Sequence, residues 1–99
     1  MTAGAEVQSK VLASNVAATT PWASPPGEGQ FIVTAVATWG GGTVKLQVQA
    51  ADGSAVDIPD ASSTADNTFR VFLSRQDLIR VNIATSTAVY VDIKHISWG

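Results

Sequence analysis

FIVTAVATWGGGTVKLQVQA, residues 31–50, carries the clearest secondary-structure signal in the chain. On both sides of three glycines, apolar residues recur at every second position, which is the pattern of a β-strand with one buried face. The residues that share a face are Phe31, Val33, Ala35, Ala37 and Trp39 on the first side, and Val44, Leu46 and Val48 on the second. The three glycines can supply the positive φ angles of a tight reversal. The stretch therefore predicts a β-hairpin.

Further strands are predicted downstream of this hairpin. Asp52 and Gly53 form a turn pair, and a short strand at 55–58 is expected to end at Pro59. Alternating apolar segments follow at residues 68–73, 78–83 and 88–96. Residues 74–77 are short enough to join the first two of these segments as a second hairpin. The chain should contain about seven strands.

The pattern is weaker upstream of the hairpin. Residues 10–16 predict an edge strand, and residues 17–29 predict a long loop because their prolines lack the amide hydrogen of a ladder position. We expect Trp22 in this loop to cap the open end of the core, with contact to a partner as the less favoured alternative. Residues 1–9 are small and polar without a period, so they predict a frayed terminus or an arm that becomes ordered when a partner covers it.

The fold class follows from these segments. None shows an apolar stripe with the period of a helix, so almost no helix is expected. Short strands about ten residues apart, each with one apolar face, need a second sheet to cover them. We therefore predict one all-β domain at residues 10–99, an antiparallel β-sandwich of about seven to eight strands. A jelly roll is one topology that fits.

The composition limits the kinds of partner. Charged residues make up 14% of the chain, against roughly 25% in typical soluble domains, so much of the surface is neutral or apolar and suits burial against partners. The net charge is −2 and the six Lys and Arg residues are scattered, which argues against nucleic acid. We expect neither a signal peptide nor a membrane span. The chain contains no cysteine, which excludes disulfides and thiolate chemistry.

No catalytic, cofactor or metal site is predicted. The single histidine, His95, continues the inward series of the last strand, and no Gly-x-Ser-x-Gly motif accompanies it, so we interpret it as structural. Asp52, Asp57, Asp60 and Asp66 could form an oxygen cage for calcium, but their spacing matches no EF-hand. Aspartate is also a preferred turn residue, and we interpret the four as turn residues.

Exposed large side chains are the remaining candidates for function. Phe72 lies opposite the inward series of its strand, while Trp22 and Trp98 lie on a loop and a tail. Large apolar side chains on a surface of low charge are typical of interfaces. The candidate partner-binding residues, including the N-terminal arm, are Thr2, Ala5, Val7, Trp22, Phe72 and Trp98.

The order of short motifs adds a resemblance that covers roughly residues 10–96. The motifs are the glycine turn at 40–42, Thr43-Val44-x-Leu46-Gln47, Asp52-Gly53, Thr68-Phe69, Arg80-Val81 and Ala88-Val89-Tyr90-Val91. In this order they resemble small β-sandwich virion proteins of tailed bacteriophages, namely capsid decoration (cement) proteins and head-fibre or tail-fibre modules. Members often carry a tryptophan in the strand after the Asp-Gly turn, where this chain has Ala55, Val56 and Ile58.

The resemblance implies a structural virion protein without enzymatic activity. Such a protein is made in the host cytoplasm, binds the outer surface of the phage head where subunits of the major capsid protein meet, and forms homo-oligomers. The alternative within the same group is a carbohydrate- or receptor-binding fibre module, in which Trp22 or Trp98 would stack on sugar rings.

Overall fold

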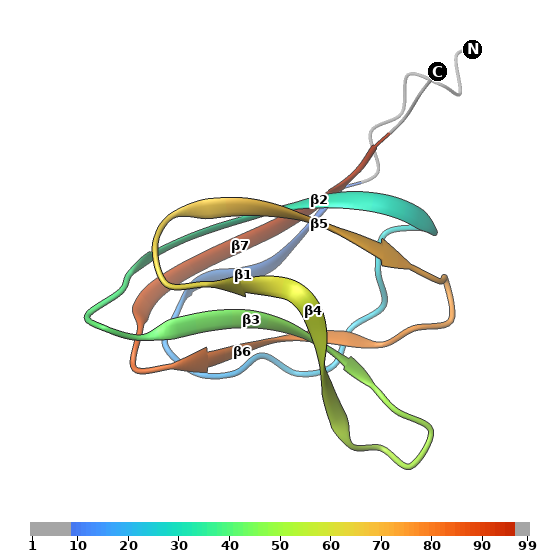
Figure 1. Cartoon of the computed structure of the whole chain (residues 1–99), viewed down its shortest axis with the longest axis horizontal. Helices are drawn as coiled ribbons and strands as arrows, with labels where there is room; N and C mark the ends of the chain where they lie inside the picture. The colour runs from blue at the N-terminus through green and yellow to red at the C-terminus, as the bar shows by residue number, and fades with distance from the viewer. Residues whose placement is uncertain (1–8, 97–99) are drawn as a thin grey trace.

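The structure is a computed structural model that describes residues 9–96, and in this range the chain forms seven β-strands and no helix (Figure 1). The strands are β1 (Ser9–Val16), β2 (Gly29–Thr38), β3 (Thr43–Gln49), β4 (Ala55–Ser63), β5 (Asn67–Leu73), β6 (Ile79–Ala84) and β7 (Thr87–His95). The predicted strand positions are confirmed to within one or two residues, except at β4, which runs beyond its expected end at Pro59.

Two antiparallel sheets pack face to face. One sheet has the order β1-β7-β2-β5 and the other β4-β3-β6. In Figure 1, β2, β5 and β7 lie above β3 and β6. The predicted β-sandwich is confirmed, and β1 is an edge strand as expected.

The long loop between β1 and β2 extends the three-stranded sheet along β6. Thr20 N–H donates to the carbonyl of Val81 at 3.0 Å, and Ala23 and Ile79 exchange two backbone hydrogen bonds of 2.8 Å. With this segment added, the second sheet has the order 19–23, β6, β3, β4. Together with β1-β7-β2-β5, this is the strand order of a jelly roll, in which two Greek keys form two sheets and most consecutive strands lie in opposite sheets.

The core lies between the sheets and consists of the inward series that the sequence indicated. Phe31, Val33 and Ala35 on β2 are fully buried, as are Val89 and Ile93 on β7. From the other sheet come Val44, Leu46, Ile79 and Val81. Contiguous burial of this kind contributes about 25 cal/mol per Å² of apolar surface removed from water, and it is the main force that holds the sheets together.

The predicted hairpin at residues 31–50 is wrong. β2 pairs with β5 and β7, whereas β3 pairs with β4 and β6, so the glycine turn carries the chain from one sheet to the other. Two strands that face each other across a core show the same alternation as two that pair, and the sequence pattern alone does not separate these cases. The loop at 74–77 likewise joins β5 to β6 in the opposite sheet, so the second predicted hairpin is also wrong.

Instead, a hairpin is formed by the consecutive strands β3 and β4. It turns at Asp52-Gly53, where Gly53 has φ 90°. β4 then continues through Pro59 because it is an edge strand, in which proline can point away from the ladder. Its pairing breaks there, since Lys45 faces Ser62 but Gln47 faces Asp57.

Candidate binding surfaces

The outward side of the four-stranded sheet exposes several large apolar side chains, and we call it the outer face. Its apolar members are Val11 on β1, Tyr90 on β7, Val36 on β2 and Phe72 on β5, with exposed fractions of 65%, 48%, 42% and 76%. Val36 lies directly opposite Tyr90 in the ladder, and Phe72 lies opposite Gln30. The exposure that the sequence indicated for Phe72 is confirmed. The other three were not singled out as candidates.

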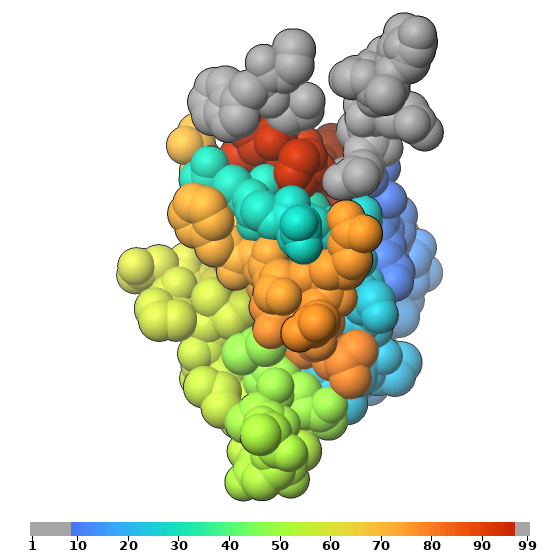
Figure 2. Space-filling view, turned by 90° about the vertical axis from the view of Figure 1, so that its right-hand side faces the viewer, coloured from blue at the N-terminus to red at the C-terminus, as the bar shows by residue number. Residues whose placement is uncertain are grey.

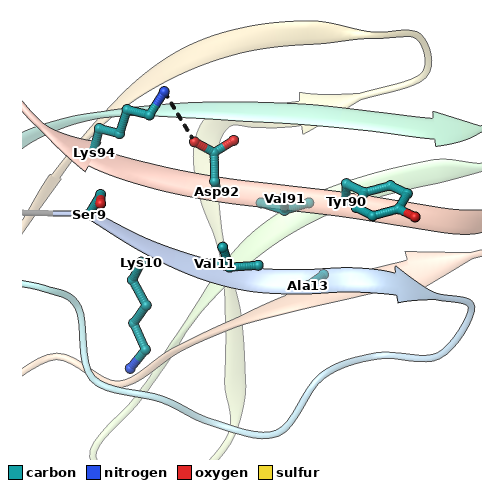
Figure 3. Close-up of a pocket in the computed structure, with 8 residues that line it drawn as sticks. All are labelled: Ser9, Lys10, Val11, Ala13, Tyr90, Val91, Asp92 and Lys94. Atoms are coloured by element: carbon teal, nitrogen blue, oxygen red, sulfur yellow. Dashed lines mark ion pairs between the residues drawn. The ribbon is translucent and has the colours of Figure 1, made fainter.

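A groove of about 470 Å³ lies on β1 and β7 at one end of this face (Figure 3). Val11 and Tyr90 contribute its apolar lining, while Asp92 and Lys94 form an ion pair of 3.5 Å beside them. Figure 3 shows Lys10 pointing away from this ion pair, and its ammonium donates to the carbonyl of Ser24 at 2.9 Å. The groove is therefore suited to an apolar side chain of a partner, flanked by one carboxylate and one ammonium.

Trp22 lies on the outward side of the other sheet and does not belong to the core, so the expectation that it caps the core is wrong. The guanidinium of Arg80 sits 4.7 Å from the centre of its half-buried ring, a cation–π contact. Arg80 Nε–H donates to Gln47 Oε1 at 2.9 Å, and Gln47 Nε2–H donates to Asp57 Oδ1 at 2.7 Å. Lys45 adds an ion pair of 3.1 Å to Asp57. A network of side-chain contacts thus crosses this sheet from Trp22, in the loop between β1 and β2, to Asp57 on β4.

Trp39 has the capping position that was expected for Trp22. Its ring packs partly buried against the core at the end of β2, and its Nε1–H donates to Asp66 Oδ1 at 2.8 Å. Asp66 also accepts from the backbone N–H of Ala37 at 3.3 Å. The sequence placed Trp39 on the inward face but contained no signal for its partner, because Asp66 lies twenty-seven positions away.

The remaining candidates for chemistry have structural roles. Asp52 accepts from the hydroxyl and the backbone N–H of Ser54, at 2.6 and 3.0 Å, which lowers the pKa of this carboxyl and fits its predicted turn role. Within residues 9–96, no three acidic or histidine side chains come together as metal ligands. His95 packs edge-to-face on Phe31, with ring centres 5.2 Å apart. This contact fits its structural interpretation.

Asp57 makes the stability of the fold dependent on pH. Hydrogen bonds from Gln47 and then from Lys45 lower the pKa of this carboxyl below the usual value of 3.8. The native state therefore binds this proton more weakly than the unfolded chain does. The resulting stabilisation is present above about pH 4 and is lost as the pH falls through the lower native pKa.

We expect Asp57→Asn to weaken the dependence of stability on pH at the acid end. The measurement is urea unfolding at about pH 6 and about pH 3. Asp60→Asn is the control, because Asp60 makes no hydrogen bond or ion pair with a side chain in the part of the chain that the structure describes. An unchanged difference between the two pH values in Asp57→Asn would contradict a contribution from this network.

Four of the predicted partner-binding residues, Thr2, Ala5, Val7 and Trp98, lie outside the described residues. Their role stays a prediction. Between residues 9 and 96 there is no helix with the length and hydropathy of a membrane span.

No protein-family model matches the chain, and no curated protein matches it significantly. The resemblance to phage virion proteins therefore rests on the sequence motifs, and the case for function rests on the surfaces described above.

Proposed function

We propose that this protein is a non-enzymatic capsid decoration protein that attaches to the head of a tailed bacteriophage through the outer face. The observation that carries the proposal is the exposure of Val11, Val36, Phe72 and Tyr90 on one side of the four-stranded sheet. Exposed large apolar side chains on a surface of low charge favour burial against another protein.

The physical argument concerns how much free energy such a face can contribute. A large apolar or aromatic side chain buried in an interface often contributes about 2 kcal/mol or more on truncation. Several modest contacts on this face would bind one copy of the protein only weakly to one site on the capsid. On a capsid, many neighbouring copies of the binding site raise the effective concentration, so that modest contacts are sufficient for retention.

The jelly-roll topology supports this proposal without deciding it. Jelly rolls occur among viral capsid proteins and also among lectins, so the fold is shared by both candidate functions. The lectin-like alternative, a fibre module that binds sugar, would use Trp22 or Trp98 for stacking. Arg80 already lies over one face of the half-buried Trp22 ring, which leaves this tryptophan less available to a sugar.

The test compares two matched valines on opposite sheets. Val36 on the outer face and Val56 on β4 are 42% and 47% exposed, so a lysine at either position should leave the fold intact. Val36→Lys places an ammonium in the proposed interface and should reduce the amount of protein retained on purified phage heads by about tenfold or more. Val56→Lys should bind like the unchanged protein. Retention is measured by co-sedimentation with the particles.

Equal retention of both variants would overturn the outer face as the attachment surface. No retention of the unchanged protein on heads, together with binding to glycans on an array, would favour the fibre module instead.

A further inference from the structure

The free edges of the two sheets differ in how well they are protected from pairing with another strand. An unpaired edge strand presents a row of N–H and C=O groups, and proteins commonly block such edges with bulges, proline or a covering loop. β1 carries two register shifts and a positive φ at Asn15. β4 carries Pro59, a positive φ at Asp60 and a break in its pairing. The outer side of β6 is covered by residues 19–23.

β5 lacks these forms of protection. It pairs with β2 in unbroken register from Asn67 to Leu73, and no strand within residues 9–96 pairs with its other side. Its seven residues include neither proline nor glycine, and none has a positive φ. Its exposed side chains are those of Asn67, Thr68, Arg70 and Phe72, and the aromatic Phe72 is 76% exposed. Figure 2 shows the end of β5 and the loop after it, in orange, at the surface of the molecule.

We propose that β5 pairs with β5 of a second copy of this chain, antiparallel about a two-fold axis at Val71. Residues 69–73 of each copy would pair, and the two four-stranded sheets would become one continuous eight-stranded sheet. Such edge-to-edge addition satisfies backbone donors and acceptors of both copies. The proposal concerns how the protein associates with itself and does not depend on binding to a capsid.

The side chains of β5 favour a second copy as the occupant of this edge. With Val71 at the axis, Phe72 of each copy lies directly opposite Arg70 of the other, which gives two cation–π contacts. Arg70 makes no ion pair or hydrogen bond with the rest of residues 9–96, so its guanidinium is available. A shift of the axis to Arg70 would place two guanidinium groups opposite each other, which is unfavourable. Of these two registers, the one with the axis at Val71 is therefore favoured.

The first test is the oligomeric state of the isolated protein. Sedimentation velocity over a range from low micromolar to near-millimolar protein should show a weak, concentration-dependent dimer, because the paired segment is short. Phe72→Lys replaces an aromatic ring by a charge next to Arg70 of the second copy and should raise the dissociation constant by about tenfold or more. Val36→Lys, on the same face but away from the edge, should dimerise like the unchanged protein.

The second test reads the register directly and uses the absence of cysteine from the chain. Arg70→Cys and Phe72→Cys are prepared as separate proteins and oxidised alone or mixed. Directly opposite Cβ atoms in an antiparallel ladder lie about 4.5–5.5 Å apart, close to the reach of a disulfide. Only the mixture should give a disulfide-linked dimer in high yield, and this heterodimer keeps one of the two Phe72–Arg70 contacts.

A monomer at every concentration would overturn the proposal and would leave capsid binding untouched, because that is measured separately on particles. A dimer that Phe72→Lys does not weaken would place the contact elsewhere and would also overturn it. Efficient cross-linking of Arg70→Cys with itself would overturn the register.

Discussion

Phe31→Ala should lower the free energy of unfolding by about 3–5 kcal/mol, the range measured for removal of a buried phenylalanine. Phe31 is fully buried on β2, and β2 lies between β7 and β5 in the four-stranded sheet. Its ring packs on the imidazole of His95 and against the inward side chains of the opposite sheet. Because strands on both sides hold β2 in place, the cavity should collapse only in part.

The measurement is equilibrium unfolding in urea. Phe31→Leu is the control, because it keeps most of the buried volume and should cost less than about 1.5 kcal/mol. A loss of under about 1 kcal/mol for the alanine variant would show that the site can close on itself and that Phe31 is not central to the core.

Gly42→Ala should destabilise the fold by about 3 kcal/mol, at the upper end of the usual cost of overpacking. A Cβ at this position would collide with the backbone carbonyl of Ala84 and with the backbone and hydroxyl of Ser86. Ser86 is itself buried, and its hydroxyl donates to the carbonyl of Trp39 at 3.3 Å. Backbone atoms cannot rotate away as a flexible side chain can, so the two turns at this end must separate.

Gly41→Ala distinguishes this steric effect from the effect of backbone conformation. Gly41 has φ 82° but open space around it, so alanine there should cost about 1 kcal/mol of conformational strain. The sequence led us to expect positive φ at all three glycines, but only Gly40 and Gly41 have it. Equal losses for Gly41→Ala and Gly42→Ala, measured by thermal and urea unfolding, would contradict the steric explanation.

These glycines illustrate which parts of the fold could be read from the sequence. Alternation with a period of two locates strands and their inward faces, and Phe31, Leu46 and Val91 are buried as predicted. The same alternation does not specify pairing, because a strand packed across the core has the same apolar face as a strand beside it in the sheet. The close approach of Gly42 to Ser86 is a contact between distant segments, and a run of three glycines does not reveal it.

The candidate surface was only partly predictable, for a related reason. Phe72 could be identified because it lies opposite the inward series of its own strand. Val11 could not, because alternation places it on the same side as Ala13, yet Val11 is 65% exposed while Ala13 is buried. A shift in register between these two residues separates them, and a β-bulge of this kind leaves no clear mark in the local sequence.

The position of β7 affects the order in which the molecule can fold. β7 is the last strand along the chain, yet it lies inside the four-stranded sheet between β1 and β2. Among the strands of residues 9–96, β1 therefore has none to pair with until β7 is in place, and about eighty residues separate the paired segments. Only β3 and β4 can pair early across a short loop. We therefore infer folding in about milliseconds to seconds, as in other proteins dominated by long-range strand pairing. Until β7 has folded into the sheet, the unpaired β1 can form incorrect pairings with other strands.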